Sequence, residues 1–307
     1  MPYIRITQGI VMSRILADLS RQTRRLLDLE RQLATGQRVN TPSDDPLAAR
    51  RAIAAQAEIT ANSQFMTNIS TAQPILVDTE SALRTALDYI QRANELTLQG
   101  LNATNTQDQR DQIANEVDQI IEGVLQQANS FSSGRYLFGG TRTLAEPFSV
   151  TRDANGEITA VTYVGNDEDI TVEIANGIRL PINITGQAAF TFTSPSTVDV
   201  LQTLVQIRDN LRTGDSAGLE TRLGELGQAQ SQVLIVMSRI GAVQRRLEDV
   251  TANLDEINVQ LQRVISDNID ADFAELLVNL NAQTNAYQAA LNASARIIQP
   301  SLLDFIR

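Results

Sequence analysis

The chain has 307 residues, about two domains in length. Hydrophobic residues make up 42% of it, but only 4% are aromatic and there is no Trp. A core with so few large rings favours long helices packed side by side over a deep ligand pocket. It contains no Cys and no His, and all 25 basic residues are Arg, so there is no Lys either. Thiol and imidazole catalysis, disulfides, cysteine–histidine zinc sites and lysine Schiff bases are therefore excluded. A formal net charge of −11 disfavours binding to nucleic acid or to an anionic membrane. Because only carboxylates, Arg, Tyr and hydroxyl groups remain for catalysis, and no pair of carboxylates has a pattern suited to acid–base chemistry, we expect a protein that is not an enzyme and that holds no cofactor or metal.

The first predicted element is an amphipathic helix. Residues 12–33 carry a heptad repeat that places apolar side chains on one stripe, as in the seam of a coiled coil. Gly36 predicts the end of this helix, and the two prolines within 42–46 break any continuation. Either Ser43 or Asp44 is expected to cap the next helix. A metal pair formed by the adjacent carboxylates is the less favoured interpretation.

Two further helices are predicted before residue 130. Residues 47–99 are rich in Ala and have apolar residues at helical spacing, with Pro74 as a kink or a boundary. Residues 100–106 predict a turn, and 107–129 predict a second amphipathic helix.

The middle of the chain has the pattern of short strands. β-branched residues are concentrated in four runs, at 148–150, 158–164, 170–174 and 178–184. Asn155-Gly156, residues 165–167 and Asn176-Gly177 separate these runs, and Asn-Gly between strands is a strong hairpin signal. We therefore expect a small outer β domain at 141–195, with a small core of its own.

Two acidic turns lie within this β segment, at 153–157 and 167–169. The first shares a few positions with a calcium-binding loop but lacks the remaining spacing and the distal Glu. Solvated hairpin turns are the favoured interpretation of both.

Helical patterns return after the β segment. Residues 198–211 predict a helix and 213–215 a break. Residues 233–268 then follow the alternating three- and four-residue spacing of a coiled coil over five heptads. The register breaks at 268–272 and restarts at 273–298. This break is either a stutter or a joint between two rods.

The expected fold is mainly α with a β insertion. The amino-terminal coiled-coil segment, 1–40, is expected to pair with 268–307. Residues 41–140 and 196–267 would form a helical rod domain. A single pair of narrow helices has little core, so its apolar stripe is expected to bind further copies of the chain. The predicted assembly interface consists of Met12, Ile15, Leu19, Leu26, Leu29, Leu33, Phe273, Leu277, Leu280, Tyr287, Leu291 and Ile298.

Residues 33–49 carry a motif that closely resembles the amino-terminal signature of the hook–filament junction proteins in the bacterial flagellin superfamily. Residues 92–96, 287–297 and 301–304 agree with the same family, and the resemblance covers both terminal regions but not the β insertion. Flagellins carry a related first segment, so a flagellin or a flagellin-like filament protein is the alternative. The signature residues are Gly36, Arg38, Val39, Pro42, Ser43, Asp44, Asp45 and Pro46, followed by Gly134, Arg135, Tyr136 and Phe138.

This resemblance implies a structural role in the bacterial flagellum and in motility. Copies would self-associate in a ring through their terminal helices, with hook-associated protein 1 on the hook side and flagellin on the filament side. A flagellar export chaperone and type III export would deliver the chain outside the cell. The first eight residues have no pattern of a cleavable signal peptide, which fits that route. An intracellular coiled-coil scaffold would share the heptads and the acidic charge, and it remains the less favoured alternative.

Overall fold

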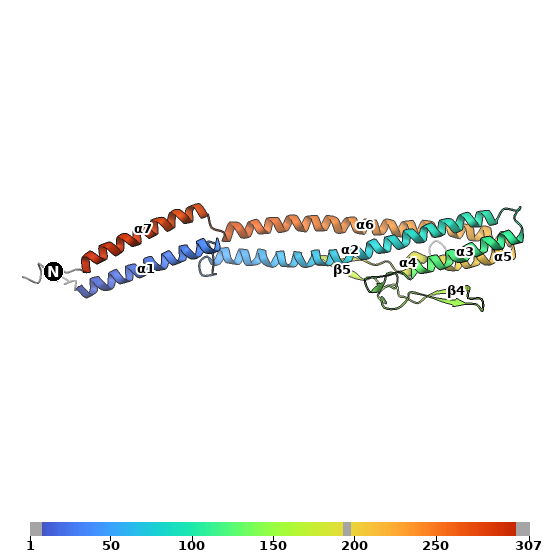
Figure 1. Cartoon of the computed structure of the whole chain (residues 1–307), viewed down its shortest axis with the longest axis horizontal. Helices are drawn as coiled ribbons and strands as arrows, with labels where there is room; N and C mark the ends of the chain where they lie inside the picture. The colour runs from blue at the N-terminus through green and yellow to red at the C-terminus, as the bar shows by residue number, and fades with distance from the viewer. Residues whose placement is uncertain (1–7, 193–197, 299–307) are drawn as a thin grey trace, which may run out of the picture. The chain divides into compact units, whose positions relative to one another are not determined.

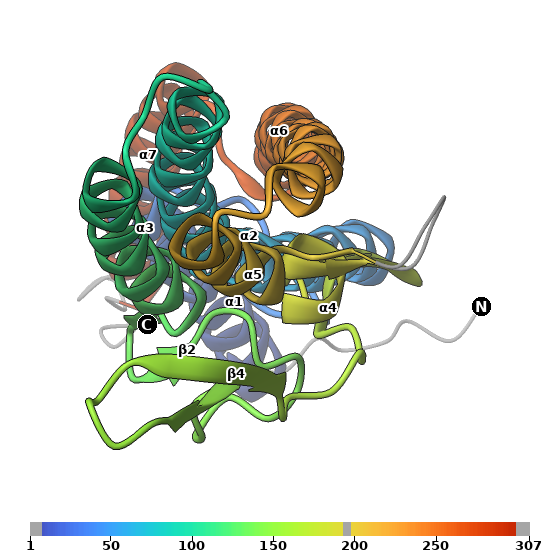
Figure 2. The same cartoon turned by 90° about the vertical axis from the view of Figure 1, so that its right-hand side faces the viewer.

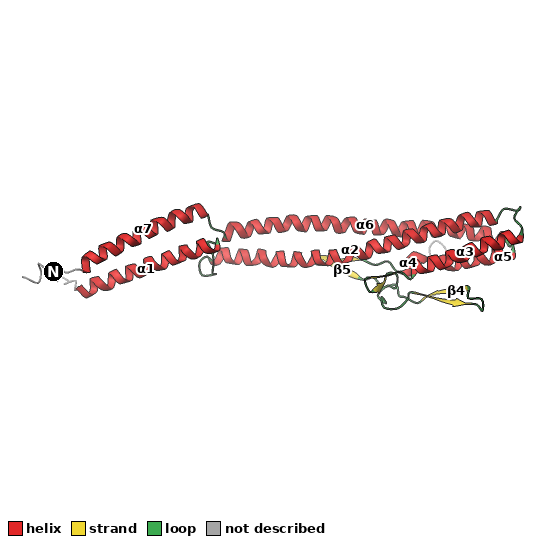
Figure 3. Cartoon of the chain, viewed as in Figure 1, coloured by secondary structure: helices red, strands yellow, loops and turns green. Residues whose placement is uncertain are grey.

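The computed structural model describes residues 8–192 and 198–298, so the predicted closing segment after residue 298 lies outside the described residues. The chain divides into a terminal unit, residues 1–61 with 256–307, and a central unit, residues 62–255. Helices dominate both units (Figures 1 and 3). None of the described helices is long and apolar enough to cross a membrane.

The terminal unit is built on two antiparallel helices, α1 (Gln8–Thr35) and α7 (Phe273–Ile298). Figure 1 shows them side by side. Gly36 ends α1 with a φ of 70°, a left-handed conformation that Gly adopts without strain. Asp272 caps α7, because its Oδ1 accepts hydrogen bonds from the amides of Ala274 (2.8 Å) and Glu275 (3.3 Å). The expectation of long terminal helices packed together is confirmed.

The start of α2 (Pro46–Gly100) differs from the prediction by one residue. Its cap is Asp45, whose Oδ1 accepts from the amides of Leu47 (3.2 Å) and Ala48 (3.0 Å). Asp44 instead turns back and accepts from the preceding amides at 40 and 41. The predicted cap at Ser43 or Asp44 is therefore wrong, because Asp44 closes the turn and leaves the helix end to its neighbour. α2 continues through Pro74, which is not a boundary.

Three further helices of the described residues lie wholly in the central unit, and α2 and α6 (Ser216–Ile269) each have residues in both units. α3 (Gln107–Ala128) begins with a reciprocal capping box between Thr106 and Gln109, and α4 (Gly186–Phe190) is short. α5 (Val200–Thr213) is capped by Asp199 and ends at a left-handed Gly214. α6 carries the predicted five-heptad seam. Every second residue of this seam from Val233 to Leu254 is buried, and so is Val236, whereas the seam beyond Leu254 is half buried or exposed.

The strands form separate antiparallel pairs, not one sheet. The two predicted Asn-Gly hairpins are confirmed, whereas residues 165–167 connect different pairs. The Asp153 carboxylate accepts from the amides of Asn155 and Glu157 (both 2.9 Å) and so closes the first hairpin turn. The pairs are β1 (Phe131–Ser132) with β2 (Arg135–Tyr136), β3 (Phe148–Arg152) with β4 (Ile158–Tyr163), β5 (Thr171–Ala175) with β6 (Ile178–Pro181), and β7 (Thr191–Phe192) with β8 (Val198–Asp199).

The β segment has no separate core, contrary to the expectation. Its buried side chains, among them Phe148, Ile158 and Ile174, belong to one hydrophobic cluster with the helices of the central unit. β4 lies beside α5 in Figure 2. The reason is that two-stranded pairs cannot bury an apolar face by themselves and need a helix to cover it. Polar contacts join the same elements, because Arg208 on α5 donates to the carbonyl of Ile158 at 2.8 Å.

Candidate assembly surface

The terminal heptads meet in a seam between α1 and α7. On α1, Ile15, Leu19, Leu26, Leu29 and Leu33 are each half buried. Leu280 and Tyr287 are half buried on α7, where the predictions missed the buried Leu276. A side-chain hydrogen bond crosses the seam, from Gln283 Nε2 to the carbonyl of Gln22 at 3.4 Å. The structure therefore brings seven of the predicted interface residues together within one chain.

Four other predicted interface residues are exposed, namely Met12, Phe273, Leu277 and Leu291. The side chain of Ile298 lies outside the described residues. With about 100° of rotation per residue, the predicted row through Phe273 and Leu291 lies about 60° around α7 from the row through Leu276 that packs on α1. The apolar stripe of α7 is thus wider than the seam, and one edge of it has no partner among the described residues of the terminal unit.

Exposed leucines on α1 lie beside this free edge. Leu16 and Leu27 are roughly 100–120° around α1 from the row through Ile15 and Leu26. In an antiparallel pair, the same sense of rotation on both helices leads to the same side. Six residues therefore form what we call the apolar face: Met12, Leu16, Leu27, Phe273, Leu277 and Leu291, all between 37% and 56% exposed.

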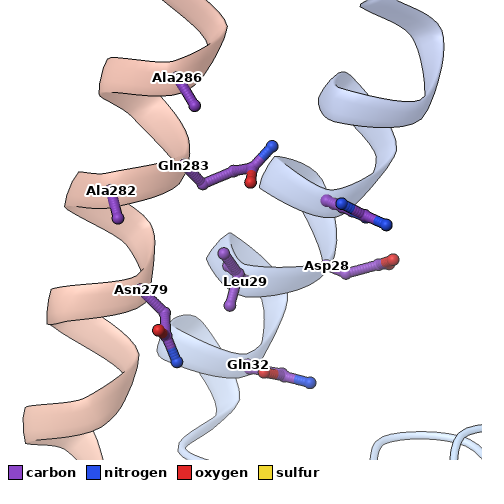
Figure 4. A pocket seen from close by; sticks show the side chains of 8 residues that line it. Asp28, Leu29, Gln32, Asn279, Ala282, Gln283 and Ala286 are labelled. Carbon is purple, nitrogen blue, oxygen red and sulfur yellow. The ribbon is translucent and has the colours of Figure 1, made fainter. Parts of the chain in front are cut away.

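A groove runs between the two helices on the other side of the pair, and Figure 4 shows its side chains. We call it the polar groove, since amides and charged groups form much of its wall. Leu29, Ala282 and Ala286 supply small or apolar surface within it. The other lining residues are Arg25, Asp28 and Gln32 on α1, and Asn279 and Gln283 on α7.

The first family signature forms a joint between the end of α1 and the start of α7, which we define as residues 36–45 and 268–272. Arg38 is its centre: its amide donates to the carbonyl of Ile269 (2.7 Å) and its guanidinium to that of Asn268 (2.8 Å). Gly36 accepts from the amide of Ala271 at 3.0 Å. An isolated antiparallel β-bridge between Gln37 and Asp270 thus holds together two segments that are more than 200 residues apart in sequence.

Carboxylates stabilise the same joint. Hydrogen bonds from the backbone and side chain of Thr41 lower the pKa of Asp44. The amide of Ala48 lowers the pKa of Asp45, which also lies 3.5 Å from Arg38. Val39 is buried against Ala48 in a small cluster. Among the other signature residues, Ser43 contacts the hydroxyl of Thr41, Pro42 is exposed and Pro46 begins α2.

The second signature belongs to the central unit and has a structural role there. Gly134, with a φ of 81°, makes the tight turn that leads to Arg135 in β2, and Tyr136 packs edge-on against Phe131. Phe138 is fully buried, with its ring 5.2 Å from that of Phe190. Its carbonyl accepts from the amide of Gly186 (2.8 Å) and from the hydroxyl of Tyr163 (3.0 Å). These contacts fasten the second signature to β4 and α4, which both lie within the β segment.

Comparison with known families gives two matches at the two ends of the chain. Residues 6–143 match the bacterial flagellin N-terminal helical region, and residues 223–306 match the bacterial flagellin C-terminal helical region. The seam, the apolar face, the polar groove and the joint all lie within these two matched regions. Within the described residues, no group of three or more carboxylates is arranged to hold a metal ion.

Similar proteins come from several flagellar systems. Flagellar hook-associated protein 3 of Escherichia coli is 26% identical over 283 residues, which cover 85% of this chain and 87% of that protein. Flagellin FlaB1 of Treponema pallidum is 25% identical and covers 90% of both chains. The crystal structure of Bacillus cereus FlgL is 28% identical with a TM-score of 0.57, covering 69% of this chain and 99% of that one. A putative flagellar hook-associated protein from Vibrio parahaemolyticus shares the fold, with a TM-score of 0.66, 21% identity, and coverage of 74% and 100%.

Proposed function

We infer the function of this chain from one premise: it belongs to the bacterial flagellin family, whose amino- and carboxyl-terminal helical regions it contains. It is a structural protein of the extracellular flagellum and not an enzyme, and it acts at the junction between hook and filament. The similarity to hook-associated protein 3 over 85% of the chain is the observation that carries this conclusion. Association with hook and filament components follows from that role.

The individual partners are our proposal. Copies self-associate in a ring through the terminal helices, with hook-associated protein 1 on the hook side and flagellin on the filament side. A flagellar export chaperone delivers the chain to type III export. The unpartnered apolar face supports self-association, because an exposed stripe of this kind marks an interaction surface.

The charge distribution supports the same proposal. The terminal unit contains 12 Arg and 12 carboxylates, whereas the central unit contains 13 Arg and 24 carboxylates. The whole net charge of −11 therefore lies in residues 62–255. Terminal units without net charge can pack closely around one axis without mutual repulsion, while the acidic central units are better separated. This favours an inner layer of 1–40 with 268–307, a helical rod layer and an outward β segment.

A filament-forming flagellin is the second candidate, favoured by the match to FlaB1 over 90% of both chains. Immunogold labelling of an epitope-tagged chain on intact flagella separates the two. We expect label confined to the junction with the hook, and a deletion strain that has hooks, no filaments and flagellin in the medium. Label along the whole filament would identify a flagellin, and a chain that remains in the cell fraction would identify an intracellular scaffold.

A further inference from the structure

We propose that the apolar face of one copy docks on the polar groove of the next copy, so that one α1–α7 pair offers two different surfaces to its two neighbours in the ring. The inference rests on the proposed function, since it names the surfaces through which a second copy of this chain binds. It differs from the sequence prediction, because the predicted heptad row includes residues that pack within one chain.

The two surfaces lie on opposite sides of the same helix pair. Leu27 is rotated in one sense from the seam of α1, and Arg25 and Gln32 are rotated in the other sense, each by roughly 80–120°. On α7, Leu277 and Asn279 diverge from the seam row in the same way. A subunit with one binding surface on each side can bind two neighbours, as every member of a ring must.

The two surfaces also lie at the same height along the pair. Leu27 falls between the groove residues Arg25 and Leu29 in the sequence, and Leu277 precedes the groove residue Asn279. A rotation about a ring axis parallel to the helices therefore brings the face of one copy level with the groove of the next. Ala282 and Ala286 leave room in the groove for a projecting leucine.

Charge complementarity supports the same pairing. Glu30 projects on the side of the apolar face, and Arg25 lines the groove. Both are exposed, and neither has an ion-pair partner within residues 8–192 and 198–298. They are separated by about 7 Å along the helix axis, a distance that two extended side chains can span. Docking of face on groove would bring Glu30 of one copy to Arg25 of the next.

A face-to-face arrangement fits less well. Two apolar faces packed on each other would form a closed, two-fold dimer and would bring Glu30 of one copy near Glu30 of the other. It would leave every groove unoccupied and would offer no further surface for the other copies of a ring.

Cysteine cross-linking tests the pairing directly, because the natural chain contains no Cys. The double variant Leu27→Cys/Ala282→Cys, with an epitope tag, is produced in a strain from which the natural gene has been deleted. Flagella isolated from this strain are treated with copper phenanthroline or a short bis-maleimide. We expect a ladder of covalent dimers, trimers and larger species on an immunoblot. The matched control Leu27→Cys/Val278→Cys uses an exposed residue outside both surfaces and should remain monomeric.

Two outcomes overturn the inference. Dimers from Leu27→Cys alone would show face-to-face packing. The absence of a ladder from the double variant in motile cells would show that face and groove do not meet. The proposed function is tested separately by the labelling and deletion experiments, so a correct deletion phenotype without a ladder would reject only the docking model.

A charge exchange gives an independent measurement if the cysteine variants fail to assemble. Glu30→Arg and Arg25→Glu should each increase the fraction of filaments shed under a fixed shear by about two- to five-fold, the range expected for one exposed ion pair. The double exchange, Glu30→Arg/Arg25→Glu, should return shedding to the natural level. Additive effects of the two changes would overturn the proposed contact between neighbouring copies.

Discussion

Arg208 on α5 gives the sharpest test of how the β segment is attached to the helices. Its side chain is only 3% exposed. The guanidinium donates to Asp118 Oδ1 on α3 (2.9 Å), to the carbonyl of Ile158 on β4 (2.8 Å) and to Asp209 Oδ1 (2.8 Å). Burial opposes its charge, yet the hydrogen bonds to Asp118 and Asp209 raise its pKa above the usual value. One cation therefore joins two helices and a strand.

The change Arg208→Met keeps much of the aliphatic volume but removes the charge. Asp118 then loses its partner in a site that is largely shielded from water, and the Ile158 carbonyl loses a donor. Breaking a buried pair in this way costs about 3–5 kcal/mol, and the partial exposure of Asp118 places the expected loss near the lower figure. For a unit of roughly 200 residues, each kcal/mol corresponds to about 2–4 °C, so we expect the melting temperature to fall by about 6–12 °C.

Thermal unfolding of the full chain, followed by circular dichroism, measures this loss. Arg92→Met is the matched control, because Arg92 pairs with Glu95 and Glu116 at an exposed site and its removal should cost less than about 1 kcal/mol. A fall of less than about 2 °C for Arg208→Met, or equal falls for both variants, would refute the argument that the buried cation fastens the β segment.

Four further predictions follow from the fold and the joint. Leu29→Asp places a charge in the seam between α1 and α7, so motility in soft agar should be lost while the central unit keeps its cooperative melt. The lowered pKa values of Asp44 and Asp45 mean that their contribution to the joint is present above the ordinary value of 3.8 and is lost as the pH falls below it. Amide protection in the joint, measured by hydrogen exchange and corrected for the pH dependence of the intrinsic exchange rate, should therefore be lower at pH 3 than at pH 6. Gly36→Val forces a β-branched residue into a φ of 70° and should destabilise the α1–α7 pair by about 1–3 kcal/mol, measured as loss of amide protection in α1. Replacing 141–195 by a Gly/Ser linker should lower the melting temperature of the helices, because this segment shares their core, and an unchanged melt would contradict that shared core.

The helices were predictable because their signals are local. Each heptad repeat lies within one element, and Gly36, Gly214 and the predicted turn at 100–106 mark helix ends within a few residues of the observed ones. The Asn-Gly turns predicted two hairpins for the same reason. The cap at Asp45 was missed because three adjacent polar residues can each cap a helix, and only the hydrogen bonds from Asn40 and Thr41 to Asp44 decide among them.

The packing of the β segment was not predictable from short runs of sequence. A short run of β-branched residues such as β4, which buries Ile158 and Val161, has the same sequence pattern whether it covers its own sheet or a helix. The contact that distinguishes these cases joins Ile158 to Arg208, fifty residues later in the chain. A buried Arg also has no local signature, since the same residue type on a helix is usually solvated.

The heptad pattern of α7 predicts an apolar stripe, but it does not predict which residues of the stripe pack on α1. Leu276 and Leu277 are adjacent in the sequence, and a heptad can pass through either one. The register through Phe273, Leu277 and Leu291 fits the spacing, yet α1 packs on the row that contains Leu276, about 60° away. A stripe that contacts both α1 and a neighbouring copy is wider than either contact requires. The heptad register read from the sequence therefore falls between the two rows of residues. The exposed half of such a stripe is the part left for a partner chain to cover. Only the position of α1 on α7 shows which half is exposed and which half packs within the chain.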